Sequence, residues 1–252
     1  MRKHKKNSSL ECYIILIYTI FSNECDFEAD NLDSVSRIRK NFVVDDFKEI
    51  KMNTVEPIRE IKVIKNIRSV LKSQSIRNEL LFILGINVGL RISDILKLRL
   101  SDILKPNKTP KDHVIITEKK TGKTKKFYLG DIVKKVIESY VKENPSVETE
   151  SFVFISRKGD NFPITRQQAY RILNGAAEAL GLVERDDSGI IVTGEIGTHT
   201  LRKTFGYHAY QNGTSLELLM DIFNHSSKSQ TLRYIGITEE QKKDVYLQSN
   251  LG

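Results

Sequence analysis

Side chains suited to cutting a phosphodiester bond recur along this sequence in a fixed order. Two guanidiniums can clamp the non-bridging oxygens of the phosphate, where charge grows in the transition state. A tyrosine hydroxyl can form a covalent phosphoryl ester, a lysine can protonate the leaving 5′ oxygen, and histidines can act as bases or as donors to the phosphate. Together these groups meet the needs of a cleavage that uses no metal ion. In chain order they are Arg91, Lys120, His199, Arg202, His225 and Tyr234.

Each of these residues, taken singly, also has a simple structural explanation. Arg91 could be a surface arginine at a helix start, and His225 could cap the end of a helix. Tyr234 is one of nine tyrosines, any of which could pack an amphipathic helix. The spacing of His199 and Arg202 is common in helices. It is their joint appearance in this order that favours a catalytic site.

Apolar periodicity predicts the helices that would position the first arginine. Thr54 to Lys72 has helical spacing, and Asn78 to Asn87 is strongly apolar and leads to the turn before Arg91. A further helical pattern starts at Ile92, so Arg91 is expected between two helices, where packed neighbours can hold a side chain still. Asp94, one helical turn beyond, is a supporting residue that could orient the guanidinium or simply favour the helix N-terminus.

The middle of the chain predicts a β-hairpin with a lysine-rich tip. His113 to Thr117 is rich in β-branched residues, Lys125 to Leu129 contains two aromatic residues, and Thr121-Gly122 between them is a natural turn. Clustered lysines usually form a solvated surface, and contact with nucleic-acid phosphates is the second interpretation. Composition alone does not choose one of them as a proton donor. The lysines of the hairpin are Lys119, Lys120, Lys123, Lys125 and Lys126.

The last third of the chain places the remaining candidates on helices. A helix is predicted from Gly197 to about Gln211, with Thr198 as its N-cap. The i, i+3 spacing puts His199 and Arg202 on one face of the first turn, where free N–H groups favour a phosphate. Further helices are expected at residues 131–144, 165–180, 215–223 and 226–235, and a short strand at 152–156. The fold class is therefore mainly α with a small antiparallel β-sheet (α+β).

The distribution of charge divides the chain into two parts. Its 252 residues carry a net charge of +8 with an isoelectric point near 9.3, which favours a polyanionic partner. Basic and acidic residues cancel within residues 1–52, so the whole excess of positive charge lies in residues 53–252. We therefore expect a short N-terminal segment at 1–52 and an anion-binding domain at 53–252.

The N-terminal segment gives no indication of export or of metal binding. Its apolar run Cys12–Phe21 is shorter than the ~20 residues that span a bilayer, and no small-residue cleavage site follows it. The two cysteines, Cys12 and Cys25, lack the spacing of a zinc site or a disulfide framework. We expect a buried strand or short helix here, no membrane association and a reduced, cytoplasmic setting.

With these residues in view, the sequence resembles the tyrosine recombinase (phage integrase) family from about Asn53 to Ile237. The matching stretches are GLRISDILKLRLSDI from Gly89, EKKTGK from Glu118, GTHTLRKTFGYHAYQNG from Gly197 and FNHSSKSQTLRYIGI from Phe223. One departure is Asn224, which stands where many members have glycine and which also tolerates a left-handed backbone. Another is residues 1–52, about half the length of the helical core-binding domain of full-length members. We interpret this segment as a remnant or part of that domain plus a linker.

The resemblance implies a role for each candidate. The two arginines would hold the scissile phosphate, and Lys120 would be the general acid at the leaving oxygen. His199 would assist Tyr234, the nucleophile that forms a 3′-phosphotyrosyl link, and His225 would contact the phosphate. Asp94 would support the site. The other hairpin lysines would bind DNA: Lys119, Lys123, Lys125 and Lys126.

The function implied by the resemblance is site-specific DNA recombination, with integration of a mobile element. The partners would be double-stranded DNA, further copies of the chain in a homotetramer on two synapsed sites, and an accessory DNA-bending protein. No cofactor or metal would be needed. The main alternative is a DNA-binding regulator that keeps the fold without strand exchange. A type IB topoisomerase uses the same residue types, and a basic non-enzymatic scaffold would explain the charge alone.

Overall fold

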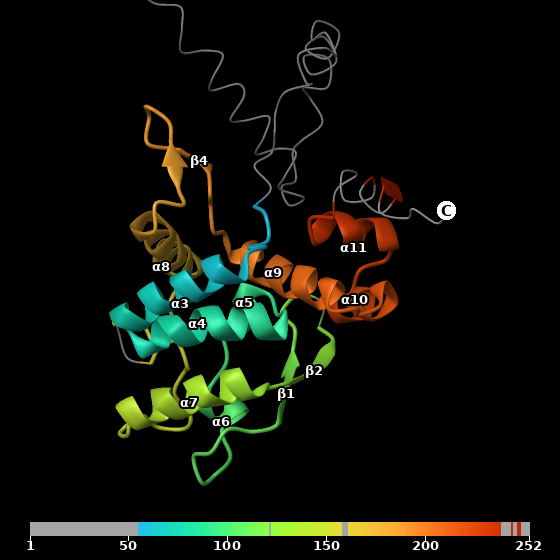
Figure 1. Ribbon diagram of the computed structural model, residues 1–252. Helices are drawn as coiled ribbons and strands as arrows, with labels where there is room; N and C mark the ends of the chain where they lie inside the picture. The colour runs from blue at the N-terminus through green and yellow to red at the C-terminus, as the bar shows by residue number, and fades with distance from the viewer. Residues whose placement is uncertain (1–54, 121, 158–160, 238–242, 244–245, 248–252) are drawn as a thin grey trace, which may run out of the picture. The chain divides into compact units, whose positions relative to one another are not determined.

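The computed structural model in Figure 1 describes residues 55–120, 122–157, 161–237, 243 and 246–247. The described part is mainly helical with two small antiparallel sheets, which confirms the predicted fold class. The predicted segment 1–52, with its apolar run, lies outside the described residues, so its separation from residues 53–252 stays a prediction. Among the helices that the structure describes, none has the length and apolar character needed to cross a membrane.

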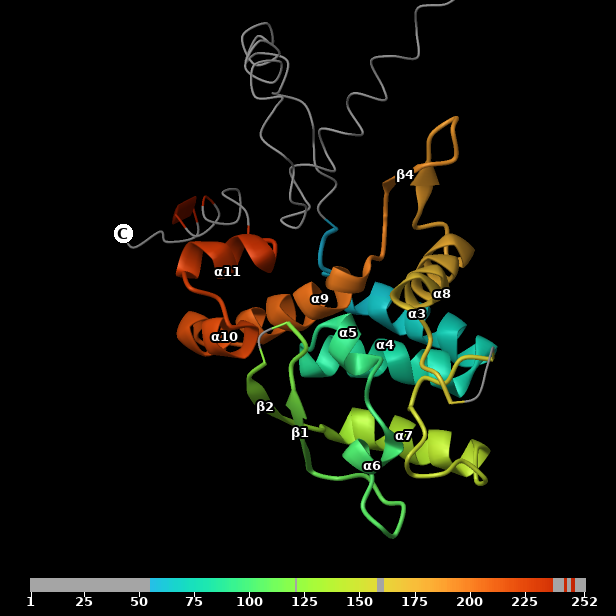
Figure 2. The ribbon, with the colours of Figure 1, turned by 180° about the vertical axis from the view of Figure 1, so that it is seen from behind.

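Helix α4 (Ile76–Val88) forms the centre of the described part. It is apolar on nearly every side, which is typical of a helix that its neighbours cover completely, and Phe82 is fully buried. Helix α4 packs against α3 (Ile61–Gln74), α7 (Asp131–Glu143) and α9 (Thr198–Gln211). Figures 1 and 2 show α7 on one side of α4 and α9 on the other. The strongly apolar stretch predicted from the sequence therefore forms the core.

The segment before α3 is extended, which corrects the helix predicted from Thr54. Its backbone hydrogen bonds go to another helix: the N–H of Ile58 donates to Thr204 Oγ1 of α9 at 2.9 Å. Ile58 belongs to the isoleucine spacing that predicted an earlier helix start, but it is a buried residue of an extended segment. We call Val55–Arg59 the strap.

Strands β1 (His113–Thr117) and β2 (Thr124–Tyr128) form the predicted hairpin. The strands are antiparallel and pair residue for residue along their whole length. Val114 and Phe127, which lie opposite each other, are buried, and their neighbours along each strand point outward. This inward face anchors the hairpin on the helical core.

The strand predicted at residues 152–156 is wrong. This stretch makes isolated bridges, such as the one between Phe152 and Arg99, in place of a ladder. Pro163, which lies opposite Ile155, has no N–H and cannot extend the pairing. The remaining short elements are α5 (Ile92–Ile95), α6 (Leu100–Ile103), α8 (Arg166–Ala179), β3 (Glu184–Arg185) and β4 (Ile191–Thr193).

Helices α10 (Leu216–Phe223) and α11 (Lys228–Tyr234) pack against the end of α9 around a small second core. Gly206 of α9 permits this close approach. A Cβ atom at Gly206 would lie 2.6 Å from the Phe223 ring and 2.7 Å from Ile235 Cγ2. The second core therefore holds the helix that ends in the predicted nucleophile against the helix that carries the predicted histidine–arginine pair.

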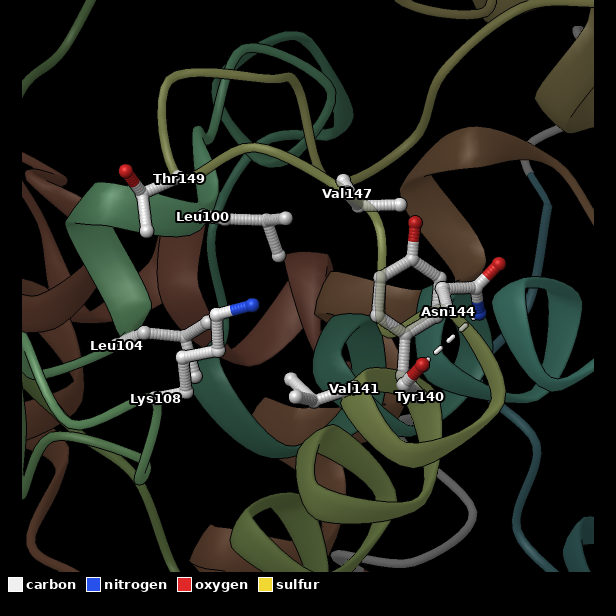
Figure 3. Close-up of a pocket in the computed structure, with 8 residues that line it drawn as sticks. All are labelled: Leu100, Leu104, Lys108, Tyr140, Val141, Asn144, Val147 and Thr149. Carbon is white, nitrogen blue, oxygen red and sulfur yellow. Dashed lines mark hydrogen bonds between the residues drawn. The ribbon is translucent and has the colours of Figure 1, made fainter.

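A narrow crevice lies between α6 and α7 (Figure 3). Its volume of about 10 Å³ leaves room for no more than roughly one water molecule. The Tyr140 hydroxyl donates to Val153 O (2.9 Å), and the Asn144 amide donates to Tyr140 O (2.8 Å, dashed in Figure 3). We regard this crevice as packing space within the core. Its lining residues are Leu100, Leu104, Lys108, Tyr140, Val141, Asn144, Val147 and Thr149.

Candidate active site

Arg91 lies at the junction of two helices, as predicted. Helix α4 ends at Val88, and its C-cap residue Gly89 turns the chain with a left-handed backbone (φ 61°). Arg91 is the N-cap residue of α5. Its Nη1 lies 2.8 Å from Glu118 Oε2, so the two groups form an ion pair. The side chains are 19% and 4% exposed. Water therefore screens this pair far less than a surface pair.

Asp94 is buried and supports the hairpin. Its Oδ1 accepts a hydrogen bond from the backbone N–H of Lys119 at 3.1 Å. Glu118, the preceding residue, is held by Arg91. The hairpin tip is therefore tied to the α4–α5 junction at two consecutive residues. Glu118 was missed as a site residue, although it is the first letter of the EKKTGK stretch.

The predicted histidine–arginine pair lies on the first turn of α9, but the cap differs from the prediction. The N-cap residue is Gly197, and Thr198 is the first helical residue. The N–H of Gly197 donates to Thr200 Oγ1 at 3.1 Å. A side chain at the cap position has little room, because a Cβ at Gly197 would lie 2.8 Å from Val55 of the strap.

Arg202 is buried, with 3% of its surface exposed, and two backbone carbonyls fix its guanidinium. Nη1 donates to Gly89 O (2.8 Å) and Nη2 donates to Phe223 O (2.9 Å). A guanidinium carries about five N–H donors, so further donors remain for an anion. These two acceptors are neutral carbonyls, and burial lowers the pKa of Arg202. An incoming phosphate would therefore meet an ordered positive charge.

Tyr234 meets two histidines at the end of α11. His199 Nδ1 lies 3.4 Å from Tyr234 Oη, and the two rings stand edge to face with centroids 6.5 Å apart. The His225 ring lies 5.0 Å from the Tyr234 ring, and His225 Nδ1 is 3.1 Å from Thr231 Oγ1. The structure thus brings together three residues that are separated in the sequence.

Burial and neighbouring cations set the protonation of this cluster. Desolvation raises the pKa of Tyr234, while Arg202 and Arg91 oppose that rise, so the phenol is protonated at neutral pH. His199 remains accessible to solvent, yet partial desolvation, followed by the charge of Arg202, lowers its pKa below the usual 6.5. The same two causes lower the pKa of His225. Both imidazoles are therefore neutral at pH 7 and can accept a proton.

Lys120 lies at the exposed tip of the hairpin, and its charge helps to lower the pKa of His199. The predicted proton donor is thus within electrostatic reach of the histidine that contacts the phenol. Lys119 and Lys126 are exposed as well, and Lys126 Nζ lies 5.2 Å from the centre of the Tyr128 ring. These exposed ammonium groups are accessible to a polyanion.

Two lysines of the hairpin are directed toward the end of α10. Lys123 Nζ donates to Asn224 Oδ1 (2.9 Å), and Lys125 Nζ donates to Ile222 O (2.5 Å). Burial, followed by the charge of Arg202, lowers the pKa of Lys125 to about 8. Asn224 has a left-handed backbone (φ 53°), which asparagine tolerates. Strand β2 is therefore fastened to the turn that carries His225.

Sequence reasoning missed Lys203, which follows the predicted arginine on α9. Lys203 is 8% exposed, its Nζ donates to Val55 O (2.7 Å), and the same atom lies 5.5 Å from the centre of the Tyr234 ring. The sequence does place Lys203 one helical turn after His199, and this spacing could have identified it as a neighbour of the site.

Together, these groups have the arrangement needed to hold and cut a phosphodiester. Two guanidiniums present donors, a neutral imidazole contacts a protonated phenol, and an ammonium lies nearby. Over the described residues, no group of three His, Cys, Asp or Glu side chains is placed to hold a metal ion. The acid–base and electrostatic groups of the described site are side chains.

Residues 58–241 match the family model described as Phage integrase family. The probable integrase/recombinase YoeC of Bacillus subtilis (strain 168) is 43% identical over 195 residues, which cover 77% of this chain and 97% of that protein. Tyrosine recombinase XerD of Oceanobacillus iheyensis is 29% identical over 210 residues, which cover 81% of this chain and 58% of that protein. The chain thus matches nearly all of YoeC and little more than half of XerD.

Solved structures share the fold at low sequence identity. The crystal structure of XerA recombinase gives a TM-score of 0.60 at 16% identity and covers 99% of this chain and 94% of that one. The Tn1549 transposon integrase in complex with transposon right end DNA gives a TM-score of 0.57 at 14% identity, with 93% and 75% covered. These likenesses confirm the helical architecture with small antiparallel sheets that the sequence predicted.

Proposed function

This chain belongs to the phage integrase family, and from that membership we propose that it is a site-specific DNA recombinase. It cuts and rejoins DNA through a 3′-phosphotyrosyl intermediate, with no cofactor. The observation that carries the proposal is the meeting of a neutral imidazole with the phenol of Tyr234, 3.4 Å from His199 Nδ1, beside the guanidinium of Arg202.

In the proposed cleavage step, Tyr234 Oη attacks the scissile phosphorus and His199 takes the phenol proton. The bond from phosphorus to the 5′ oxygen breaks, and Lys120 protonates that oxygen. Arg91 and Arg202 hold the non-bridging oxygens while their charge grows. Religation reverses these steps with a 5′ hydroxyl as the attacking group. Because the phosphotyrosyl ester conserves the bond energy, no external energy source is needed.

The second histidine and the supporting residues complete the proposed site. His225 contacts the phosphate, and Asp94 keeps the hairpin against the α4–α5 junction through its bond to the Lys119 backbone. The exposed hairpin lysines Lys119 and Lys126 contact the DNA backbone as an electrostatic fringe. Lys123 and Lys125 add positive charge beside them while they hold the hairpin against the end of α10.

The proposed partner is double-stranded DNA. Support comes from solved structures of similar fold, namely XerH site-specific recombinase bound to palindromic difH substrate and the Tn1549 transposon integrase in complex with transposon right end DNA. Exchange between two duplexes requires four active sites, so we propose a homotetramer on synapsed sites, with an accessory DNA-bending protein. Residues 1–52 contribute a partial core-binding region. The protein acts in the cytoplasm on the DNA of a mobile element.

Covalent capture tests this function directly. The protein is incubated with a library of nicked duplexes of randomised sequence, so that cleavage releases a short strand and traps the adduct. Denaturing washes then retain only covalently bound DNA. We expect enrichment of a defined sequence with the wild type and with the control Tyr246→Phe, which alters an exposed tyrosine. Tyr234→Phe should retain none.

The same selection separates the alternative functions. Sequence-specific binding that never yields a covalent adduct would favour the DNA-binding regulator. Adducts with no sequence preference would favour a topoisomerase.

A further inference from the structure

The strap lies along one face of α9, and several independent contacts fix it there. Ile58 N donates to Thr204 Oγ1, and Ile58 O lies 2.9 Å from His208 Nε2. Arg59 Cζ lies 5.4 Å from the centre of the Tyr207 ring. The contacted residues of α9 recur one turn apart, so they form one continuous face. In Figure 1 the strap is the blue-cyan stretch that runs beside α9 into α3.

The strap also contacts the chain just after α11. Arg59 Nη2 donates to Gly236 O at 2.9 Å. Gly236 has a positive φ of 76°, and a Cβ atom there would lie 3.0 Å from atoms of Glu56 and Pro57. The strap therefore bridges α9 and the end of the helix that carries Tyr234.

Lys203 joins the strap to the Tyr234 ring. Its Nζ donates to Val55 O at 2.7 Å and lies 5.5 Å from the centre of the Tyr234 ring. A largely buried ammonium that faces an aromatic ring is attracted to it, and the carbonyl of Val55 fixes where the ammonium lies. This hydrogen bond ties the strap directly to the lysine.

His199 and Lys203 are four residues apart on α9 and contact the same tyrosine. His199 reaches the phenol oxygen, while Lys203 lies against the ring. Residues at i and i+4 lie one above the other on a helix. A single helical face thus sets both the distance from base to hydroxyl and the position of the ring.

We propose that Lys203 is a positioning residue for Tyr234, held in place by the carbonyl of Val55. The inference rests on the proposed function of Tyr234 as nucleophile. Lys203 does not touch the phosphate in this account. It keeps the phenol oxygen within reach of His199 and of the scissile phosphorus. The strap supplies the anchor for Lys203 through the carbonyl of Val55.

The test separates DNA affinity from the cleavage rate. The rate of adduct formation is measured at saturating concentrations of the nicked duplex recovered by covalent capture, and the dissociation constant is measured separately. Lys203→Met should lower the saturated rate roughly ten- to a hundredfold and leave the dissociation constant unchanged, because a small displacement of a reacting group is costly. Lys203→Arg, which keeps the cation and the donor, should retain most of the rate.

Two further variants complete the design. Lys142→Met removes an exposed lysine from α7 and should behave as wild type. Arg59→Met removes the bond to Gly236 O and should lower the saturated rate by a smaller factor, which provides a result even where Lys203→Met does not fold. A wild-type rate in Lys203→Met would overturn the inference, as would a loss of affinity in place of rate. Where Lys203→Met does not fold, a wild-type rate in Arg59→Met would overturn it. A wild-type protein that forms no adduct would instead refute the proposed function on which the inference rests.

Discussion

His199 Nδ1 lies 3.4 Å from Tyr234 Oη, although 35 residues separate them in the sequence. The distance slightly exceeds that of a strong hydrogen bond, and such contacts often tighten only when substrate is bound. This pair joins the phenol of the proposed nucleophile to an imidazole that can accept its proton.

The pH dependence of cleavage should report His199. Its pKa is lowered below 6.5, so the neutral, proton-accepting form prevails at pH 7 and is lost as the pH falls through that lowered value. We therefore expect a flat cleavage rate near neutrality and a decline at acidic pH. His199→Asn should slow cleavage by roughly 10²–10⁴-fold and remove the acidic decline.

The other groups that face the phenol serve as the comparison. His225 also has a lowered pKa, whereas Arg202 stays charged throughout this range. If the acidic decline persists in His199→Asn and disappears in His225→Asn, the base is His225, and the assignment to His199 is wrong. Affinity for the duplex must be measured at each pH to separate binding from chemistry.

Glu118→Gln should destabilise the fold by about 1–3 kcal/mol, because it leaves Arg91 without its buried anionic partner. Urea denaturation measures this loss. Asp112→Asn is the matched control, since Asp112 pairs with Lys105 and Lys134 at the surface, where an ion pair adds little stability. Equal unfolding midpoints for Glu118→Gln and wild type would contradict the structural role of the buried pair.

Two glycine substitutions should have opposite effects on stability. Gly206→Ala forces a Cβ to within 2.6 Å of the Phe223 ring, so we expect a loss of about 1–3 kcal/mol. Gly175→Ala on α8 meets no atom within 4 Å and should raise stability by about 0.5–1 kcal/mol through its better helix propensity. Thermal denaturation distinguishes them. Similar melting temperatures would mean that α9, α10 and α11 do not pack as described.

The salt dependence of DNA binding should distinguish the hairpin lysines. Lys119 and Lys126 are exposed, so replacing both with glutamine should flatten the slope of log affinity against log salt by roughly two counterions. Lys125 is half-buried and donates to Ile222 O, so Lys125→Gln should change the slope much less. If single substitutions of Lys119, Lys125 and Lys126 change this slope equally, Lys125 leaves Ile222 O and contacts the phosphates when DNA is bound.

Local patterns were sufficient to predict much of the fold. Flanking apolar helices and a glycine placed Arg91 at a turn, and alternating strands around Thr121-Gly122 predicted the hairpin. These features depend on neighbours in the sequence, where periodicity and turn chemistry are directly visible.

Features that depend on distant partners were missed or wrongly predicted. The first helix was predicted too early because the N–H of Ile58 finds its acceptor, Thr204 Oγ1, 146 residues away. Glu118 and Lys203 were missed because their partners, Arg91 and Val55, lie on other elements. Neither the pattern of charges along the sequence nor the spacing of motifs reveals such contacts between distant elements.

The most direct test of the central claim is to identify the residue that becomes linked to DNA. The adduct from covalent capture is digested with trypsin and nuclease, and mass spectrometry locates the nucleotide. Cleavage after Arg233 and Lys242 gives a peptide that begins with Tyr234. We predict the nucleotide on Tyr234 of that peptide. A nucleotide on another residue, such as Tyr207 or Tyr246, or an undiminished adduct from Tyr234→Phe, would contradict the account.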